Sequence, residues 1–436
     1  MSKPRGGVSI LLVLALTNLV AYAARNALFA VYPTLRIRYN VSDADLGLLA
    51  TVFVLPHALA TLPFGWAGDR RDRRYVIAVG MVLASAAGAA GALTTTYHGL
   101  AFTRALVGLG TAAVVPVANS ILGQLFDGPR KAVLMSVFNL GLLLGGVAGF
   151  AVGVALGFPV VVVALAVPGV ALAVVLCVMP VPQRKRSATL PPAKVVSEGS
   201  DTHHHGSSMT ELAGAFIADA RRLLRISTLR WLMLSTTFMA FAAGAYNAWL
   251  KDFLNRDKHM SDAAASTLLA IALFGGLAGI PTGGALADRF RRRARNGRLW
   301  TIVIGMAMTA PCAVAAILLP EGPLLYVAGI LTLFFISWYH APMAASVDDL
   351  APAELTVAAQ GLVIFTMHLF GTSPSSWVVG VVSDATTLRT AMWVPTVMLV
   401  LAALCMARAT RTFGADVRAR AAGTPGASGE LPQAVG

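Results

Sequence analysis

Apolar residues along this chain occur in long blocks rather than in the alternating pattern of a half-buried strand. The blocks recur at about the ~20 residues that a helix needs to cross the hydrocarbon core of a bilayer. Gly, Pro and basic residues separate them. The pattern therefore predicts twelve transmembrane helices, at 8–35, 44–68, 75–96, 99–126, 131–155, 158–180, 229–254, 262–288, 299–319, 323–347, 355–384 and 388–411.

The spans form two sets of six, separated by a polar stretch rich in Ser, Pro and His. We expect an all-α membrane protein of two pseudo-symmetric six-helix bundles, at 1–180 and 229–412. A cytoplasmic linker at 181–228 would join them, and 413–436 would be a disordered cytoplasmic tail. Within the linker, 209–225 has apolar residues at helical spacing with basic residues between them. This indicates an amphipathic helix on the anionic membrane surface, the alternative being a solvated lead-in to the seventh span.

The charges agree with a membrane protein and indicate its orientation. Only 12% of the 436 residues are charged, against roughly 25% in soluble domains. Of the 34 Lys and Arg residues, 26 lie in segments that are cytoplasmic if both termini are, six lie in outer loops and two lie within spans. This bias predicts cytoplasmic N- and C-termini, and we expect the membrane to be a bacterial inner membrane. The net charge of +14 does not indicate nucleic-acid binding, because the basic residues lie in short loops between apolar spans.

No cofactor, metal site or catalytic group is expected. Cys177, Cys312 and Cys405 all fall inside apolar blocks, where cysteine behaves as a small hydrophobe. The triple histidine at 203–205 lies in the linker, and we do not expect it to be a functional metal site. The sequence has no carboxylate pair within the spans and no Ser-His-Asp arrangement, so a lipid-modifying membrane enzyme is disfavoured against a carrier.

One string occurs at the same boundary of both halves. Residues 65–74 read G-W-A-G-D-R-R-D-R-R, and residues 284–293 read G-A-L-A-D-R-F-R-R-R. The glycine would allow close helix approach, and the aspartate would join an ion network that holds one conformation and breaks in another. The expected gating residues are Gly65, Asp69, Arg70, Arg73, Gly284, Asp288 and Arg289. The alternative is that these residues are only positive-inside anchors.

The repeated string resembles the loop G-x-x-x-D-R/K-x-G-R-R/K that is the signature of the major facilitator superfamily, with Asp72 in place of the second glycine. A narrower resemblance is to the spinster branch, which moves lysolipids and sphingolipids. The chain carries Y-A-A-R at 22–25, G-L-L-A-T-V-F at 47–53, R-A-L-V-G-L-G-T-A at 104–112, A-P-C at 310–312 and H-L-F-G-T-S-P-S at 368–375. These are similar to N-Y-x-D-R, G-L-L-Q-T-V-F, R-x-x-x-G-x-G-E-A, A-P-C and H-L-L-G-D-x-x-S-P of that branch. The resemblance implies the major facilitator fold and alternating access.

Three departures from the spinster pattern remove carboxylates. Ala24 and Thr372 stand where that branch has aspartate, and Thr111 stands where it has glutamate. Intramembrane carboxylates are the usual proton relays of transporters. Coupling to protons is therefore left open.

The two arginines of the spinster-like motifs are retained, at Arg25 and Arg104. An arginine within a span costs at least a few kcal/mol, so it needs a partner. A substrate phosphate or carboxylate suits its forked donors, while backbone carbonyls and nearby asparagines are the alternative. Further candidates for the substrate site are Thr111, Tyr246, Asn247, Trp338, His340, His368 and Thr372. Core packing is the alternative explanation for the aromatic residues, and hydrogen bonding by a neutral imidazole is the alternative for the histidines.

The leading hypothesis is therefore an alternating-access carrier for an amphipathic anionic lipid such as a lysophospholipid, acting as a monomer among membrane lipids. The alternative is a proton-coupled carrier or exporter of small organic anions or drugs. A lipid carrier needs a pocket that is polar at one end and apolar at the other.

The orientation can be tested by labelling single cysteines in a variant without the three native ones. Lys258→Cys, in an expected outer loop, should react with a membrane-impermeant maleimide added to intact cells. Ser200→Cys, in the linker, should react only after the cells are broken. The opposite pattern would invert the topology.

Overall fold

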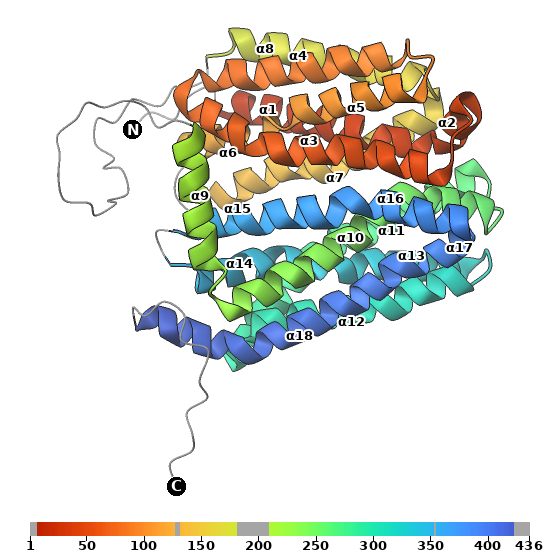
Figure 1. Ribbon diagram of the computed structural model, residues 1–436. Coiled ribbons are helices and arrows are strands. Elements are labelled where there is room, and N and C mark those ends of the chain that lie inside the picture. The colour runs from red at the N-terminus through yellow and green to blue at the C-terminus, as the bar shows by residue number, and fades with distance from the viewer. Residues whose placement is uncertain (1–6, 127–130, 181–208, 353–354, 423–436) are drawn as a thin grey trace.

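The structure, a computed structural model, describes residues 7–126, 131–180, 209–352 and 355–422. Those residues form helices and connecting turns, with no strand among them. Most helices run side by side along one direction. The N-terminal half, red to yellow, lies against the C-terminal half, green to blue (Figure 1).

The first half contains eight helices for six spans. They are α1 (Gly7–Ala30), α2 (Tyr32–Tyr39), α3 (Asp43–Arg70), α4 (Arg73–Gly91), α5 (Tyr97–Thr111), α6 (Val114–Leu125), α7 (Lys131–Leu156) and α8 (Val160–Val178). The fourth span is divided into α5 and α6 by a short turn, and α2 is a short helix outside the first span.

The second half repeats the plan with more interruptions. After α9 (Met209–Leu223) come α10 (Ser227–Arg256), α11 (Asp262–Arg293), α12 (Gly297–Leu318), α13 (Pro323–Ile336), η1 (Ser337–Tyr339), α14 (His340–Leu350), α15 (Thr356–Thr366), η3 (Met367–Thr372), α16 (Ser373–Ala385), α17 (Leu388–Ala391) and α18 (Trp393–Ala421). The tenth span is α13, η1 and α14 together. The eleventh is α15, the π-helical turn η3 and α16.

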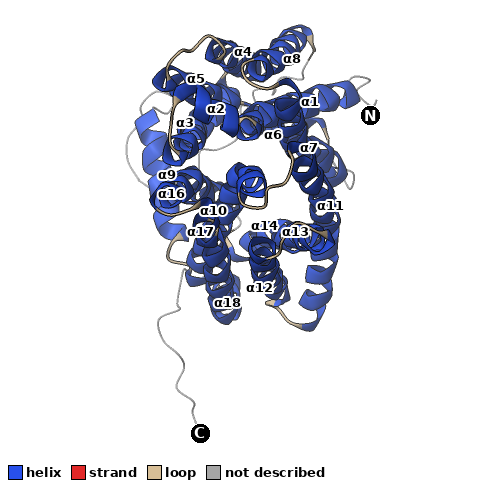
Figure 2. Cartoon of the chain, turned by 90° about the vertical axis from the view of Figure 1, so that its right-hand side faces the viewer, coloured by secondary structure: helices blue, strands red, loops and turns tan. Residues whose placement is uncertain are grey.

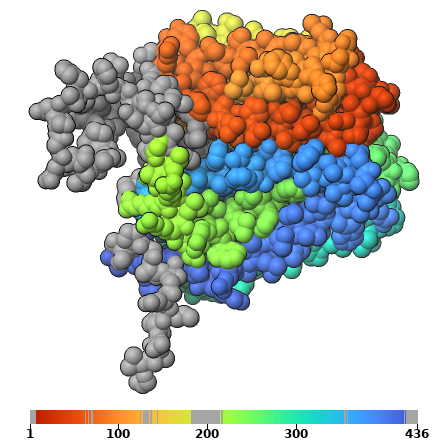
Figure 3. Space-filling model, in the orientation of Figure 1, coloured from red at the N-terminus to blue at the C-terminus, as the bar shows by residue number. Residues whose placement is uncertain are grey.

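The two ends of the bundle differ, and we name them by what lies there. The distal end carries α2 and α17, and it faces the viewer in Figure 2. The proximal end carries the start of α1, the helix α9 and the end of α18. In the space-filling view the two halves meet along a continuous seam on the visible face (Figure 3).

The fold class predicted from the sequence is confirmed. Within the described residues, eleven segments are long and apolar enough to cross a membrane. The seventh span, α10, is less apolar than these eleven segments. It matches them only when the end of α9, which is bent from α10 by 104°, is counted with it. The reason is that α10 lies inside the bundle, against α18, η3 and α1, so polar residues on it face protein rather than lipid.

Glycines at every fourth position of α7 allow it to lie directly on α1. A Cβ on Gly141, Gly145, Gly149 or Gly153 would come within 2.7 Å of a carbonyl oxygen of α1. Residues four apart lie on one face of a helix, so the four glycines form one smooth stripe. Small residues at this spacing let two membrane helices pack backbone to backbone.

Two features at the proximal end go beyond the predicted spans. The helix α9 crosses the ends of the bundle nearly at right angles to α10 (Figure 1). In addition, α18 continues to Ala421, past the expected start of the tail at 413. Phe413 is 2% exposed, and Asp416 accepts a 2.7 Å hydrogen bond from the backbone N–H of Thr228. These contacts hold the extra turns against the start of α10.

The glycine stripe generates a prediction about stability. Gly149→Ala places a Cβ 2.2 Å from the carbonyl oxygen of Ala23, so α1 and α7 must separate, at a cost of about 1–3 kcal/mol. Gly361→Ala is the control, because nothing lies within 4 Å of its added Cβ and alanine favours a helix by about 1 kcal/mol. Thermal unfolding in detergent should show a lower midpoint for the first variant and an equal or higher one for the second. Equal midpoints for the two variants would show that the glycine stripe does not control how closely α1 and α7 pack.

Candidate functional site

Arg25 lies near the distal third of α1 and is half-buried. Its guanidinium carbon is 5.9 Å from the ring centroids of both Tyr22 and Phe53, at the range of a cation–π contact. Among the described residues it makes no hydrogen bond or ion pair. Its forked donors are therefore available to a ligand.

Arg104 of α5 is placed differently. It is 5% exposed and donates hydrogen bonds to the backbone carbonyls of Ala24, at 3.0 Å, and Arg25, at 3.1 Å. Its guanidinium also lies 4.8 Å from the Phe53 ring. The adjacent cavity measures only about 30 Å³, which leaves space for water but not for a lipid. Arg104 is therefore bonded to backbone carbonyls, which was the alternative to substrate binding, and it joins α5 to α1.

Polar groups from three further elements gather around Arg25. His57 of α3 stacks on Phe53, and its Nδ1 lies 3.2 Å from the Thr111 hydroxyl. His368 of η3 lies near enough to Arg25 and His57 for direct electrostatic interaction. Its Nδ1 is buried with no partner among the described residues. The structure therefore brings Arg25, Thr111 and His368 to one region, together with His57.

A cavity of about 360 Å³ lies between the halves, in the size range of small-molecule sites. Its walls come from α7, α10, α11, α12 and α13 and are mostly apolar. Tyr246, Asn247 and Lys251 of α10 supply polar groups. The Asn247 amide donates a 2.5 Å hydrogen bond to the side-chain oxygen of Asn26, the residue that follows Arg25. The predicted candidates Tyr246 and Asn247 therefore line this pocket, and Asn247 connects it to the residue that follows Arg25 in the chain.

The remaining candidates have packing roles or lie apart. Trp338 is 8% exposed and packs on Phe334 and Phe335, outside the linings of these two cavities. His340 stacks on Tyr339 at 4.0 Å and is exposed. Thr372 packs against Gly244 of α10.

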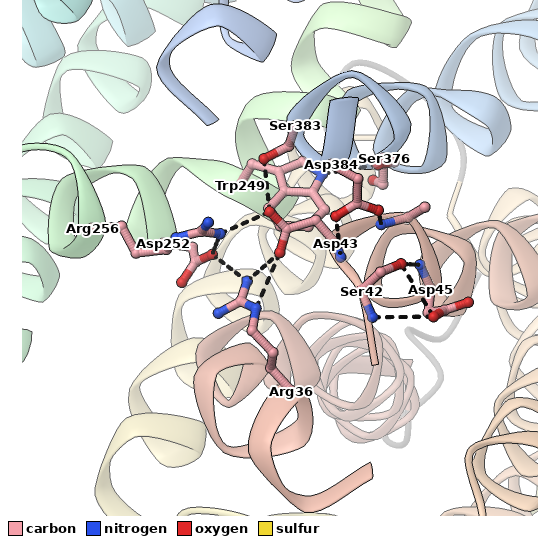
Figure 4. A network of polar contacts seen from close by, with 11 residues as sticks. Arg36, Ser42, Asp43, Asp45, Trp249, Asp252, Arg256, Ser376, Ser383 and Asp384 are labelled. Atoms are coloured by element: carbon pink, nitrogen blue, oxygen red, sulfur yellow. Dashed lines mark hydrogen bonds and ion pairs between the residues drawn. The ribbon is translucent and has the colours of Figure 1, made fainter. Parts of the chain in front are cut away.

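Four charged residues join the two halves at the distal end (Figure 4). Arg36 of α2 contacts Asp43 at 2.6 Å and Asp252 at 2.7 Å. Arg256 contacts the same two aspartates, at 2.8 and 3.1 Å. The Asp43 and Asp252 side chains are only 6% and 1% exposed. We call Arg36, Asp43, Asp252 and Arg256 the distal ion network.

The ion pairs of the network favour the charged form of Arg36. Burial by itself lowers the pKa of Arg36, but its bonds to Asp252 and Asp43 outweigh burial and raise the pKa above the ordinary value. A third carboxylate, that of Asp384, accepts the backbone N–H groups of Asp43 and Ala44 at 2.9 and 2.8 Å. A carboxylate at a helix N-terminus also interacts favourably with the helix dipole. Each half therefore supplies an anion that the other half binds.

Additional contacts extend this closure inward. The Thr51 hydroxyl donates to the carbonyl of Ser373 at 2.6 Å. A Cβ on Gly47 would lie 2.2 Å from the carbonyl oxygen of Ser376, so α3 and α16 are in backbone contact there. The conformation is closed at the distal end. The four residues of the distal ion network lie at or beyond the outer ends of the expected spans, and no local motif links residues so far apart in the chain, so the network could not be predicted from the sequence.

The family model of the Major Facilitator Superfamily matches this chain over residues 14–295 and again over 232–429. The chain belongs to the Major Facilitator Superfamily. It is thus an integral, polytopic membrane protein, a transporter with the facilitator fold.

Named relatives confirm the resemblance to the spinster branch. Protein spinster homolog 3 of Danio rerio is 26% identical over 397 residues, which cover 86% of this chain and 76% of the relative. The sphingosine-1-phosphate transporter SPNS2 of the same organism is 23% identical, over 86% of this chain and 75% of the relative. A bacterial homologue of the human lysosomal transporter spinster, solved in an inward-facing and unoccupied conformation, has a TM-score of 0.77 at 21% identity, covering 95% and 99% of the two chains. The nucleoside transporter NupG has a TM-score of 0.70 at 14% identity, covering 92% and 98%.

The structure describes part of the repeated facilitator motif. The side chains of Asp69 and Arg70 lie outside the described residues. Arg73 is 5% exposed and donates to the carbonyl of Gly68 at 3.2 Å. In the second half Asp288 is 68% exposed and 4.0 Å from Arg298, while Arg289 is exposed. Their gating role stays a proposal.

The expected tight helix approach at the motif glycines is wrong. A Cβ on Gly65 or Gly284 would meet its nearest neighbour at 3.9 or 3.7 Å, which is ordinary contact. The tight positions are Gly68, 2.9 Å from Val117, and Gly283, 2.6 Å from Trp338. Gly283 precedes Gly284 directly and faces about 100° away from it, because there are 3.6 residues per turn. Gly68 lies three residues beyond Gly65 on nearly the same face, so in the first half the tight contact is almost one turn closer to the helix end.

The distal ion network generates a prediction about conformation. Asp43→Asn keeps the shape but removes the charge shared by two arginines. Breaking a buried pair costs about 3–5 kcal/mol, and because the arginines are partly exposed we expect about 2–3 kcal/mol to be lost from the distal-closed state. Spin labels at Ile37→Cys and Thr386→Cys, in a variant without native cysteines, should then show longer distances. Asp45→Asn is the control, since Asp45 only caps the same helix with Ser42, and equal distances in both variants would contradict a latch at Asp43.

Proposed function

We propose that this transporter carries an amphipathic anionic lipid, such as a lysophospholipid or a sphingolipid-like molecule, by alternating access. The observation that carries the proposal is the Arg25 guanidinium, which lies within the bundle among aromatic rings and has no bonded partner among the described residues. A cation held away from water without a partner is costly. An anionic headgroup would relieve that cost on binding.

The chemistry around Arg25 favours a phosphate or carboxylate. A guanidinium presents parallel N–H donors that match two oxygens of either group. Thr111, His57 and His368 would supply further polar contacts, because all three lie in the same region. Arg104 would act indirectly in this scheme, by fixing the backbone of α1 at Ala24 and Arg25.

The 360 Å³ cavity favours a ligand with an apolar tail. Its lining is apolar apart from Tyr246, Asn247, Lys251, Ser266, Thr332 and Ser337. Asn247 joins it to Asn26, the residue next to Arg25 in sequence. Each buried methylene of a tail contributes about 0.8 kcal/mol. This arrangement, polar at Arg25 and apolar beyond Asn247, is what a lipid carrier needs and is more than a small organic anion would require.

We further propose that the proximal end is cytoplasmic, because most Lys and Arg residues lie in segments at that end. The structure described above would then be closed toward the outside, and a bacterial inner membrane would be its setting. In this orientation the two motif repeats would act at the cytoplasmic face, opposite the distal ion network.

Arg25→Lys and Arg25→Ala test the proposal. Lysine keeps the charge but loses the fork, so affinity for lysophosphatidic acid should fall about tenfold or more, as expected for ~1.5–3 kcal/mol in a charge-assisted bond. Affinity for monoacylglycerol, a neutral amphiphile with the same tail, should change far less in both variants. Binding to purified protein in detergent measures this, and the alanine variant should fold at least as well because the desolvation cost is removed.

The alternatives give different results in the same experiment. If the charged and neutral amphiphiles weaken equally, Arg25 only shapes the cavity. If neither weakens, the anion site is elsewhere. If a short-chain phosphate ester binds as tightly as the lysolipid, the protein is a carrier of small organic anions.

A further inference from the structure

Lys251 lies at the distal end of the 360 Å³ cavity, one helical turn beyond Asn247 on α10. Its side chain is 5% exposed. The ammonium pairs with Asp262 at 2.6 Å and donates to the carbonyl of Ala30 at 3.3 Å. Lysine has three donors, so one is left for the pocket.

Ser266 lines the same cavity from α11. Its hydroxyl oxygen is buried and has no hydrogen-bond partner among the described residues. Ser266 is one turn beyond Asp262 on its helix, so the hydroxyl and the Lys251 ammonium lie toward the same end of the pocket. Buried polar groups are nearly always bonded, and a ligand oxygen would satisfy this one.

We infer that Lys251 and Ser266 form a second headgroup site at the distal end of this pocket, which takes the phosphate or carboxylate of an anionic amphiphile. The tail would lie in the apolar part of the cavity, between α11 and α13. This inference rests on the proposed function, since it places a second station on the path of the same lipid, after Arg25.

The contacts of Lys251 tie this site to the conformation. Ala30 is the last residue of α1, in the N-terminal half, whereas Lys251 and Asp262 belong to the C-terminal half. When the halves separate at the distal end, the bond to Ala30 breaks and Lys251 gains a second free donor. Because the Asp262 carboxylate is 67% exposed, water can solvate it while a headgroup anion takes its place at the buried Lys251 ammonium. The headgroup would thus be held at Arg25 in the distal-closed state and at Lys251 once that end opens.

The test measures headgroup preference, the ratio of affinities for lysophosphatidic acid and for monoacylglycerol of the same chain length. It uses the purified full-length protein and Asp43→Asn, which favours distal opening. In the Asp43→Asn background, Lys251→Gln should lower the preference about tenfold, the loss of one charge-assisted bond. Ser266→Ala should lower it about threefold, within the range of one neutral hydrogen bond. Ser266→Ala should also fold normally, because its hydroxyl is unbonded in the fold. Lys258→Gln is the matched control, a distal lysine that does not line the pocket and is bonded to the carbonyls of Ile317 and Leu319.

Adding Arg25→Ala separates this inference from the proposed function. If Arg25→Ala protein keeps a headgroup preference that Lys251→Gln then removes, both sites stand. If Arg25→Ala alone abolishes the preference in the Asp43→Asn background, the Lys251 site is overturned and the Arg25 site stands. If Arg25→Ala leaves the preference unchanged in the protein with native Asp43, where the distal end is closed, while Lys251→Gln and Ser266→Ala lower it in the Asp43→Asn background, the second site stands and the Arg25 site falls. Equal losses for Lys251→Gln and Lys258→Gln would overturn the second site.

Discussion

A charged side chain inside a bilayer has to find its partner within the protein or its ligand, because lipid cannot solvate it. This constraint accounts for most of what distinguishes the parts of this transporter. Arg104 meets it with the carbonyls of α1. At the distal end of the bundle, the buried carboxylate of Asp43 is likewise paired, with two arginines. Arg25 meets it only with aromatic rings. Arg104 has hydrogen-bond partners within the protein and Arg25 has none among the described residues. This difference distinguishes the structural arginine from the one that is available to substrate.

Two kinds of helix contact can be distinguished, one between the halves and one within each half. At the distal end the halves exchange charges, so that Asp252 and Asp384 of one half bind Arg36 and the start of α3 in the other. Such contacts form or break as a set, which suits a two-state closure. Within each half, backbone carbonyls face glycines, as along α1 and α7. Such dry contacts carry no charge, and they keep each bundle rigid while the halves move.

The pocket connects these two kinds of contact. Asn247 reaches Asn26, and Lys251 reaches Ala30, so one face of α10 both lines the cavity and touches α1. A ligand on this face would compete with contacts that close the distal end. The position of the substrate and the conformation of the protein would thus be coupled directly through α10.

The twelve spans, their division into two halves and the family could be read from the sequence alone. The reason is that apolar length and motif spacing are local properties, and a bilayer imposes one length on every span. Arg25, Arg104 and Asn247 could also be singled out, because a polar group in an apolar block is conspicuous wherever it folds. Tertiary structure decided which arginine was already satisfied, that Gly68 and Gly283 rather than Gly65 and Gly284 make the tight contacts, and that Arg36, Asp43, Asp252 and Arg256 meet. These outcomes depend on the rotation of each helix and on contacts between residues about 200 positions apart, and no local pattern contains either.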